Sequence, residues 1–273
     1  MKKKKLLILL LTFSLSFACK DVKKSGDEID STIENSEHTA ETNKALKTKG
    51  EEIKIVPIEH ATVILEWGDV TIYIDPTGGP TAFENQKKPD LILITDIHGD
   101  HFNMETLEAI DISQARFILP QAVADEMPDK FSKKLEILTN GDSKEFDGIL
   151  IEAIPMYNLR EEAKAFHVKG RGNGYILTIN GQRIYFSGDT EDIPEMRSLK
   201  NIDKAFVCMN LPYTMTVESA ASAVLDFKPK QVYPYHYRGR PDVSDVGMFK
   251  KLVDAGNQDI EVVQLDWYPN DEY

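Results

Sequence analysis

The feature that most limits what this chain can fold into is a run of six residues, 96–101, with the sequence Asp-Ile-His-Gly-Asp-His. The run follows Thr95 and the apolar stretch 91–94, which has the composition of a buried strand. It places four potential metal ligands close together, and Gly99 lets the backbone between them turn tightly. Helix capping would explain one carboxylate, but not two histidines and two carboxylates together. The run therefore predicts a strand end that carries a metal site.

Short β-type runs bounded by glycine, proline and aspartate begin at about residue 51. Strands are predicted over 53–58, 62–67, 70–74, 91–94, 116–119, 149–153, 174–179, 183–186, 204–209, 231–235 and 260–264. Helices are predicted over 104–109, 121–127, 216–227 and 243–255. Hairpins come first and strand–helix alternation follows, which indicates an α/β fold with about a dozen strands. No proline- or glycine-rich linker divides residues 51–273, so a single domain is predicted.

The N-terminal segment has the pattern of an export signal. Four lysines precede an apolar run over 6–17 that is too short to cross a bilayer comfortably, so 1–18 are predicted to be a signal peptide. The end of this run resembles a bacterial lipoprotein signal, which implies a lipid on Cys19 and an anchor in the cell envelope. Ordinary signal-peptidase cleavage followed by secretion is the alternative. Residues 19–50 have too few apolar side chains to fold and are predicted to be a disordered tether.

Composition excludes some partners. The chain has 45 acidic and 32 basic residues, a formal net charge of −13 at pH 7. Such a surface repels phosphate backbones, so nucleic acid is not an expected partner. The two cysteines are Cys19 and Cys208, and the second lies in an apolar run, so we expect a buried thiol and no disulfide.

The run at 96–101 resembles the His-x-His-x-Asp-His signature of metallo-β-lactamase-fold hydrolases. Three further motifs of that family occur in the expected order: His167 before a glycine-rich turn, Asp189 after a strand, and His236 after a late strand. The resemblance covers residues 51–273 and implies an αββα sandwich, in which two mixed sheets are flanked by helices. It also implies hydrolysis by a metal-activated hydroxide.

The resemblance implies two metal sites. The first would be formed by Asp96, His98 and His167, and the second by Asp100, His101 and His236, with Asp189 as a bridge between them. Two divalent ions are expected, with zinc as the first choice. Besides coordination, Asp100 and Asp189 are candidates for taking up a proton.

One position departs from the signature. Its first histidine is Asp96 here, so the first site has an anionic oxygen donor in place of a neutral nitrogen. The whole centre would then carry one positive charge fewer than the all-histidine version. Carboxylate suits harder ions, so manganese or iron is expected to be tolerated at this site beside zinc.

Among subgroups, the chain is similar to the ascorbate-6-phosphate lactonases and the N-acyl-phosphatidylethanolamine phospholipases D. The supporting stretches are 59–63, Asp75 with its following proline, 155–158 and 212–218. The substrate implied is a small ester, lactone or phosphodiester, and β-lactamase activity is disfavoured.

Residues around the ligands receive weaker predictions. Tyr157 and Asn158 are predicted to donate hydrogen bonds to a substrate oxygen. For His60, a structural hydrogen bond and a role as outer partner of a ligand are both open. Four cations flank His167 and His236 and would serve either as an anion-binding rim or as solvated loop charge. They are Lys169, Arg171, Arg238 and Arg240.

Two other kinds of function compete with hydrolysis. A lipoprotein of the same fold could bind metal without catalysis, with Asp96 marking the lost activity. An iron-dependent redox member of the fold is the other alternative, although the glutamate usual at the position of His98 in diiron members is absent. The sequence does not specify the substrate, because loop shape around a shared centre sets it in this fold. It does not specify the oligomeric state either.

Overall fold

The structure is a computed structural model that describes residues 52–268. The signal peptide predicted over 1–18, the tether over 19–50 and the lipidation of Cys19 lie outside the described residues. Within 52–268, no helix has both the length and the apolar composition needed to span a membrane.

The first sheet has six strands in the order β1-β2-β3-β4-β5-β6. The strands are β1 (Lys54–Glu59), β2 (Thr62–Trp67), β3 (Val70–Ile74), β4 (Leu91–Leu93), β5 (Arg116–Leu119) and β6 (Leu135–Ile137). The β1–β2 and β2–β3 pairs are antiparallel, and the pairs from β3 to β6 are parallel. Because parallel strands end at the same edge of a sheet, the segments after β3 and β4 lie side by side.

The second sheet has seven strands in the order β13-β12-β11-β10-β9-β8-β7. The strands are β7 (Ser143–Phe146), β8 (Ile149–Met156), β9 (Gly172–Ile179), β10 (Gln182–Phe186), β11 (Lys204–Val207), β12 (Gln231–Pro234) and β13 (Glu261–Val262). Pairing is antiparallel from β7 to β10 and parallel from β10 to β13. Both sheets are therefore mixed.

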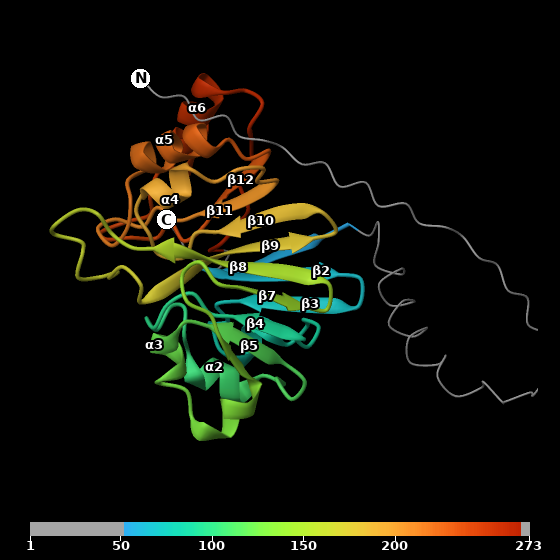
Figure 1. Cartoon of the computed structure of the whole chain (residues 1–273). Helices are drawn as coiled ribbons and strands as arrows, with labels where there is room; N and C mark the ends of the chain where they lie inside the picture. Colours follow the sequence, from blue (N-terminus) through green and yellow to red (C-terminus); the bar gives the residue numbers. More distant parts are fainter. Residues whose placement is uncertain (1–51, 269–273) are drawn as a thin grey trace, which may run out of the picture. The chain divides into compact units, whose positions relative to one another are not determined.

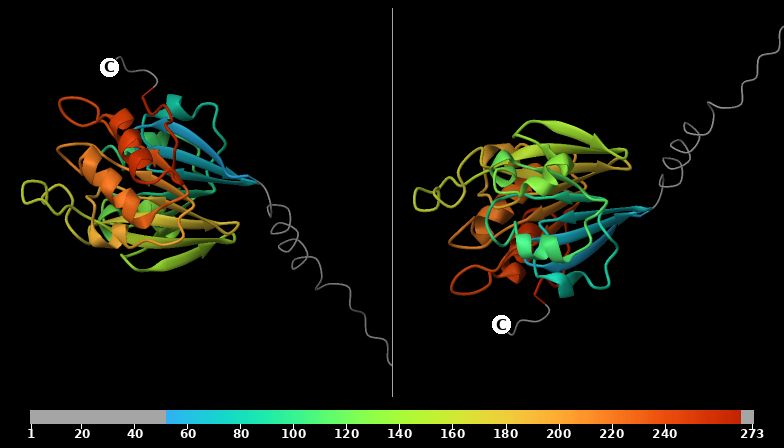
Figure 2. Two further views of the ribbon diagram at one scale, coloured as in Figure 1. Left: turned by 90° about the horizontal axis from the view of Figure 1, so that it is seen from above. Right: turned by 90° about the horizontal axis from the view of Figure 1, so that it is seen from below.

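Helices cover the outer face of each sheet. They are η1 (Pro80–Phe83), α2 (Met104–Ala109), α3 (Gln121–Ala124), η2 (Asp129–Lys134), α4 (Pro194–Arg197), α5 (Val217–Phe227) and α6 (Val246–Gly256). Figure 1 shows α2 and α3 beyond the first sheet and α4, α5 and α6 beyond the second. In Figure 2 the orange and red helices lie in front of the sheets from above, and the green helices do so from below.

The central strands are apolar on both faces because both faces are covered. Leu91 and Leu93 of β4 belong to the core shared by the two sheets, whereas Ile92 packs in the outer core with Leu107 of α2 and Val123 of α3. Side chains alternate across a strand, so a continuous apolar run is the sequence of a strand buried on both faces. This packing holds β4 rigidly just before the ligand run.

The structure confirms the predicted fold class, two mixed sheets flanked by helices. Five short elements were missed: β6, β7, α4 and the 3-10 helices η1 and η2. Strand β7 is largely exposed and has no alternating apolar pattern, so periodicity gives no signal there. The last helix begins at Val246 rather than 243, because Asp245 caps it by accepting a hydrogen bond from Met248 N at 2.8 Å.

Candidate metal centre

The candidate site is built from segments that follow strands of both sheets. The run 95–101 follows β4, Asp75 follows β3, Asp189 follows β10 and His236 follows β12, while His60 lies in the turn between β1 and β2. The φ angles of His60, Asp75 and His236 are 50°, 45° and 46°. The left-handed region is unfavourable for residues with a Cβ, and such conformations gather at functional sites.

Asp96, His98 and His167 form one group of potential ligands. His98 Nδ1 lies 2.8 Å from Asp96 Oδ2, and His167 Nε2 lies 4.0 Å from the same oxygen. His167 Nε2 is also 3.0 Å from Asp189 Oδ2. The fold thus brings together the three residues predicted for the first site and sets Asp189 beside them.

His101, Asp189 and His236 form the second group. The Nε2 atoms of the two histidines are 3.1 Å apart. Asp189 Oδ2 lies 3.4 Å from His101 Nε2, and Asp189 Oδ1 lies 3.0 Å from His236 Nε2. One carboxylate therefore contacts histidines of both groups, which is the arrangement expected of a bridging ligand.

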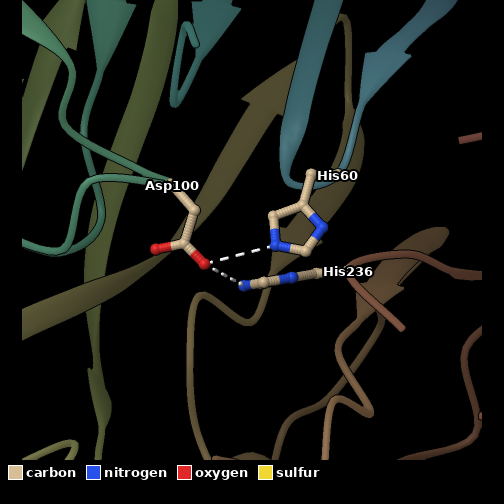
Figure 3. Close-up of side chains that lie close together, drawn as sticks. All are labelled: His60, Asp100 and His236. Atoms are coloured by element: carbon tan, nitrogen blue, oxygen red, sulfur yellow. Dashed lines mark hydrogen bonds and ion pairs between the residues drawn. The ribbon is translucent and has the colours of Figure 1, made fainter. Parts of the chain in front are cut away.

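Asp100 lies beside this second group, together with His60. Asp100 Oδ2 is 3.6 Å from His236 Nε2 and 3.2 Å from His60 Nε2. Figure 3 shows the carboxylate of Asp100 directed at both rings. His60 Nδ1 in turn lies 2.8 Å from the hydroxyl of Tyr268. His60 therefore connects a predicted ligand to a tyrosine near the end of the described chain, and this favours a role as outer partner.

Asp75 is a buried partner of His101 that the sequence did not identify as functional. Its Oδ2 lies 2.8 Å from His101 Nδ1 and accepts a hydrogen bond from Thr95 Oγ1 at 2.6 Å, while Oδ1 accepts from Thr95 N at 2.7 Å. A carboxylate on one ring nitrogen fixes the ring so that the other nitrogen faces the centre. The available signal was an aspartate directly after the mostly apolar strand β3.

The ionisation of the buried groups reflects their crowding. Burial disfavours the charged form of His101, but the carboxylates of Asp189 and Asp75 outweigh it and hold the pKa of His101 well above its usual range. Burial lowers the pKa of His236 to about 4. Burial also opposes ionisation of Asp189, yet the surrounding histidines hold its pKa well below its usual range. An anionic carboxylate beside an unprotonated imidazole is a donor set that suits a cation.

Residues 54–236 match the family described as Beta-lactamase superfamily domain, and this span exceeds half of the chain. The chain belongs to this family. The UPF0173 metal-dependent hydrolase of Pyrococcus abyssi is 34% identical over 211 residues, which cover 74% of this chain and 92% of that protein. A solved structure of a protein from Parabacteroides distasonis, described as a metal-dependent hydrolase, matches with a TM-score of 0.71 and 37% sequence identity. The match covers 79% of this chain and 93% of the other. Igni18 from Ignicoccus hospitalis, a metallo hydrolase, shares the fold with a TM-score of 0.66 at 24% identity, covering 78% and 95%.

The chain is therefore a metal-dependent hydrolase of the metallo-β-lactamase superfamily, as the ligand motifs indicated. The placement in a lactonase or phospholipase subgroup stays a prediction.

Two buried atoms of the hydrolase indicate that the residues present suit a metal ion. Asp189 Oδ1 makes no hydrogen bond with any residue in 52–268, although His236 Nε2 lies 3.0 Å away. Both are atoms that coordinate metals, so the residues present can hold such ions.

In the hydrolase, Tyr157 and Asn158 form hydrogen bonds with other residues of the chain. Asn158 Nδ2 donates to Ala163 O at 2.9 Å and to Tyr213 O at 2.6 Å, and it lies 3.1 Å from His167 Nδ1. The Tyr157 hydroxyl donates to Glu195 at 2.9 Å. Asn158 thus secures the loop around His167. The catalytic roles of both residues stay predictions, without support from these contacts.

A cavity of about 370 Å³ opens onto the clusters. Its lining includes His60, His98, Asp100, His167 and Asp189, together with Asn210, Tyr213, Arg238 and Arg240. Of the four flanking cations, Arg238 and Arg240 line this cavity. Lys169 instead pairs with Glu195 at 2.7 Å, and Arg171 pairs with Asp96 at 2.9 Å.

Proposed function

We propose that this chain hydrolyses a small anionic ester, lactone or phosphodiester in the bacterial cell envelope, with two divalent ions and zinc as the expected metal. The observation that carries the proposal is the cavity of about 370 Å³ that joins both ligand groups to Arg238 and Arg240. A cavity of this size suits a small molecule. Guanidinium groups beside it would bind a carboxylate or phosphate of the substrate.

The loop that carries the two arginines is held by close backbone packing. Arg240 N donates to Leu211 O at 2.8 Å. A Cβ at Gly239 would lie 1.8 Å from Leu211 O, so glycine is required where the loop crosses this carbonyl. The guanidinium of Arg238 lies 4.5 Å from the ring centre of Tyr268. Positive charge is thus placed at the cavity on an otherwise acidic protein, which favours an anionic substrate.

A second cavity of about 750 Å³ adjoins the first and shares His60, Asp100 and Arg238 with it. Apolar side chains such as Ile58 and Trp267 line part of it. We assign this space to the part of the substrate that carries no charge, because apolar surface there would be removed from water on binding.

The side chains of the centre divide the work of hydrolysis. Divalent ions, when bound, supply Lewis acidity and lower the pKa of water. The carboxylate of Asp189 contacts histidines of both ligand groups and so keeps the groups together. His60 Nε2 lies 3.2 Å from Asp100 Oδ2 and orients that carboxylate. Burial of His101 and Asp189 excludes bulk water, which strengthens electrostatic stabilisation of charge that develops on the substrate. Arg240 binds the anionic group and orients the scissile bond.

The test is a substrate panel with purified full-length protein supplied with zinc. Lactones, phosphodiesters, phosphonates and acyl esters are each compared with and without a carboxylate or phosphate group. We expect turnover of an anionic member that is lost in His101→Ala, and a KM for that member raised about 10-fold or more in Arg240→Ala, since a charged hydrogen bond contributes about 1.5–3 kcal/mol. Lys164→Ala, which removes a half-exposed cation paired with Glu161, is the control and should leave KM unchanged.

Three results would count against the proposal. Turnover that persists in a folded His101→Ala protein would place the activity elsewhere. Two bound ions with no turnover of any panel member would favour the non-catalytic metal-binding lipoprotein. Iron as the native metal, together with oxygen consumption, would favour the redox alternative.

The envelope location rests on the pattern of residues 1–19. A lysine cluster, a short apolar run and a cysteine support export followed by lipidation of Cys19. Labelling cells with a radioactive fatty acid tests it. The label should appear on the wild-type chain and disappear in Cys19→Ala, whereas an unlabelled, fully secreted wild-type protein would support simple cleavage.

A further inference from the structure

Asp96, which stands where the signature has its first histidine, forms a bidentate ion pair with Arg171. Arg171 Nε lies 3.1 Å from Asp96 Oδ1, and Arg171 Nη2 lies 2.9 Å from Oδ2. The side chain of Asp96 is 0% exposed and that of Arg171 is 19% exposed. A buried carboxylate is strongly unfavourable without partners, and Arg171 and His98 are both partners of Asp96 here.

The guanidinium lies beside the first ligand group. His98 Nδ1 faces Asp96 Oδ2 at 2.8 Å, and the other ring nitrogen, His98 Nε2, lies 3.4 Å from Arg171 Nη2. Asp96, His98 and His167 still present donor atoms close enough together to hold an ion. Arg171 therefore contacts two of these residues while the three remain grouped.

The packing of the two sheets delivers Arg171 to this position. Strand β9 begins directly after it, and Asn173 N donates to Thr95 O at 2.9 Å. A Cβ at Gly172 would lie 2.7 Å from the same Thr95 oxygen, so glycine allows the close approach. Arg171 Nη2 also donates to Phe166 O. The backbone next to Arg171 is thus held against Thr95, and its guanidinium is held by Phe166 O and Asp96.

Counting charges shows what the pair achieves. A neutral histidine contributes nothing to the charge of the site, whereas Asp96 contributes −1 and Arg171 contributes +1. Asp96 and Arg171 together therefore match the charge of the histidine that the signature expects. A bidentate guanidinium also fixes the plane of the carboxylate, whereas the carboxylate of an unpaired aspartate can rotate.

We propose that Arg171 is a positioning residue for Asp96, and that the two side chains together act as a metal-binding unit of zero net charge. It cancels the additional negative charge and holds the carboxylate in one orientation toward His98 and His167. The inference rests on the proposed metal-binding function of the first site. It implies that this site keeps the charge of a zinc site, instead of shifting toward harder ions as Asp96 alone would indicate.

The test compares four full-length proteins: wild type, D96H, R171Q and D96H/R171Q. Zinc affinity is measured by competition with a chelator, and bound metal by elemental analysis. In D96H a histidine ligand is restored, but the guanidinium is left without its carboxylate beside the ion. We expect zinc affinity at the first site to fall about 10- to 100-fold in D96H, from repulsion at short range, and to recover in the double variant. Cobalt absorption should report an added nitrogen ligand in both D96H proteins.

A purely structural role for Arg171 predicts a different pattern. D96H would then bind zinc as tightly as D96H/R171Q, and that equality would overturn the inference. K169Q in the D96H background is the matched control, because Lys169 is a nearby cation that pairs with Glu195 at 2.7 Å, and it should change affinity less than about twofold. If D96H does not fold, D96N with and without R171Q makes the same comparison.

Failure of the proposed function gives a separate result. A folded wild-type protein that binds a single ion would refute the dinuclear centre itself. A wild type with two ions, combined with tight binding in D96H, would refute only the role of Arg171.

Discussion

Asp75→Asn should weaken metal binding at the second ligand group while leaving every proposed ligand in place. In the wild type, Asp75 Oδ2 lies 2.8 Å from His101 Nδ1 and accepts from Thr95 Oγ1 at 2.6 Å. Asparagine has nearly the same shape, but one of its two ends is a donor. It cannot accept from Thr95 N, Thr95 Oγ1 and His101 Nδ1 in the way that two carboxylate oxygens do.

The magnitude follows from what is lost. Removal of an outer partner of a metal-ligating histidine reduces metal affinity about 10- to 100-fold, which corresponds to about 1.4–2.7 kcal/mol. The folded state should also lose about 1–3 kcal/mol, because buried donors of Thr95 and His101 are left without a good acceptor. Zinc affinity is measured by chelator competition, and stability by urea unfolding of the metal-free protein.

Asp142→Asn provides a control with the same local chemistry. Asp142 accepts from Thr139 N at 2.9 Å and from Thr139 Oγ1 at 2.6 Å in an exposed turn. This variant should lose some stability and keep its zinc affinity. The reasoning about Asp75 is wrong if Asp75→Asn binds zinc as tightly as the wild type, or if both variants lose affinity to the same extent.

Three further changes test other contacts. His60→Gln removes the ring that lies 3.2 Å from Asp100 and should lower kcat/KM about 10-fold with two ions still bound, whereas loss of an ion would make His60 a ligand. Zinc affinity should fall as pH falls from about 8 to about 6, because the raised pKa of His101 means that a proton competes with the ion at that ring; a flat profile between these values would contradict it. Lys228→Gly should raise the free energy of unfolding by about 0.5–1 kcal/mol, since Lys228 ends α5 with a φ of 49°, and an unchanged thermal midpoint would count against this.

Local patterns in the sequence were sufficient for much of the fold. Wholly apolar runs such as 91–94 predicted strands buried on both faces, and β4 is such a strand. Strands β6 and β7 gave no comparable signal, because β6 has only three residues and β7 is mostly exposed. Each is a strand because it pairs with a neighbour, β6 with β5 and β7 with β8. The apolar pattern that predicts a strand is therefore found in the neighbour and not in β6 or β7.

The sequence by itself determined the family and the candidate ligands, because those residues sit directly after strands in a fixed order along the chain. The tertiary structure decided which residues surround them. Asp75 meets His101 and His60 meets Asp100 across 26 and 40 positions of the chain. Arg171 meets Asp96 across 75 positions, only because the start of β9 packs against the segment after β4. Contacts between two sheets depend on how their faces pack, and no local pattern encodes that. An arginine that reads as loop charge in the sequence thus becomes the partner of the aspartate in the ligand run.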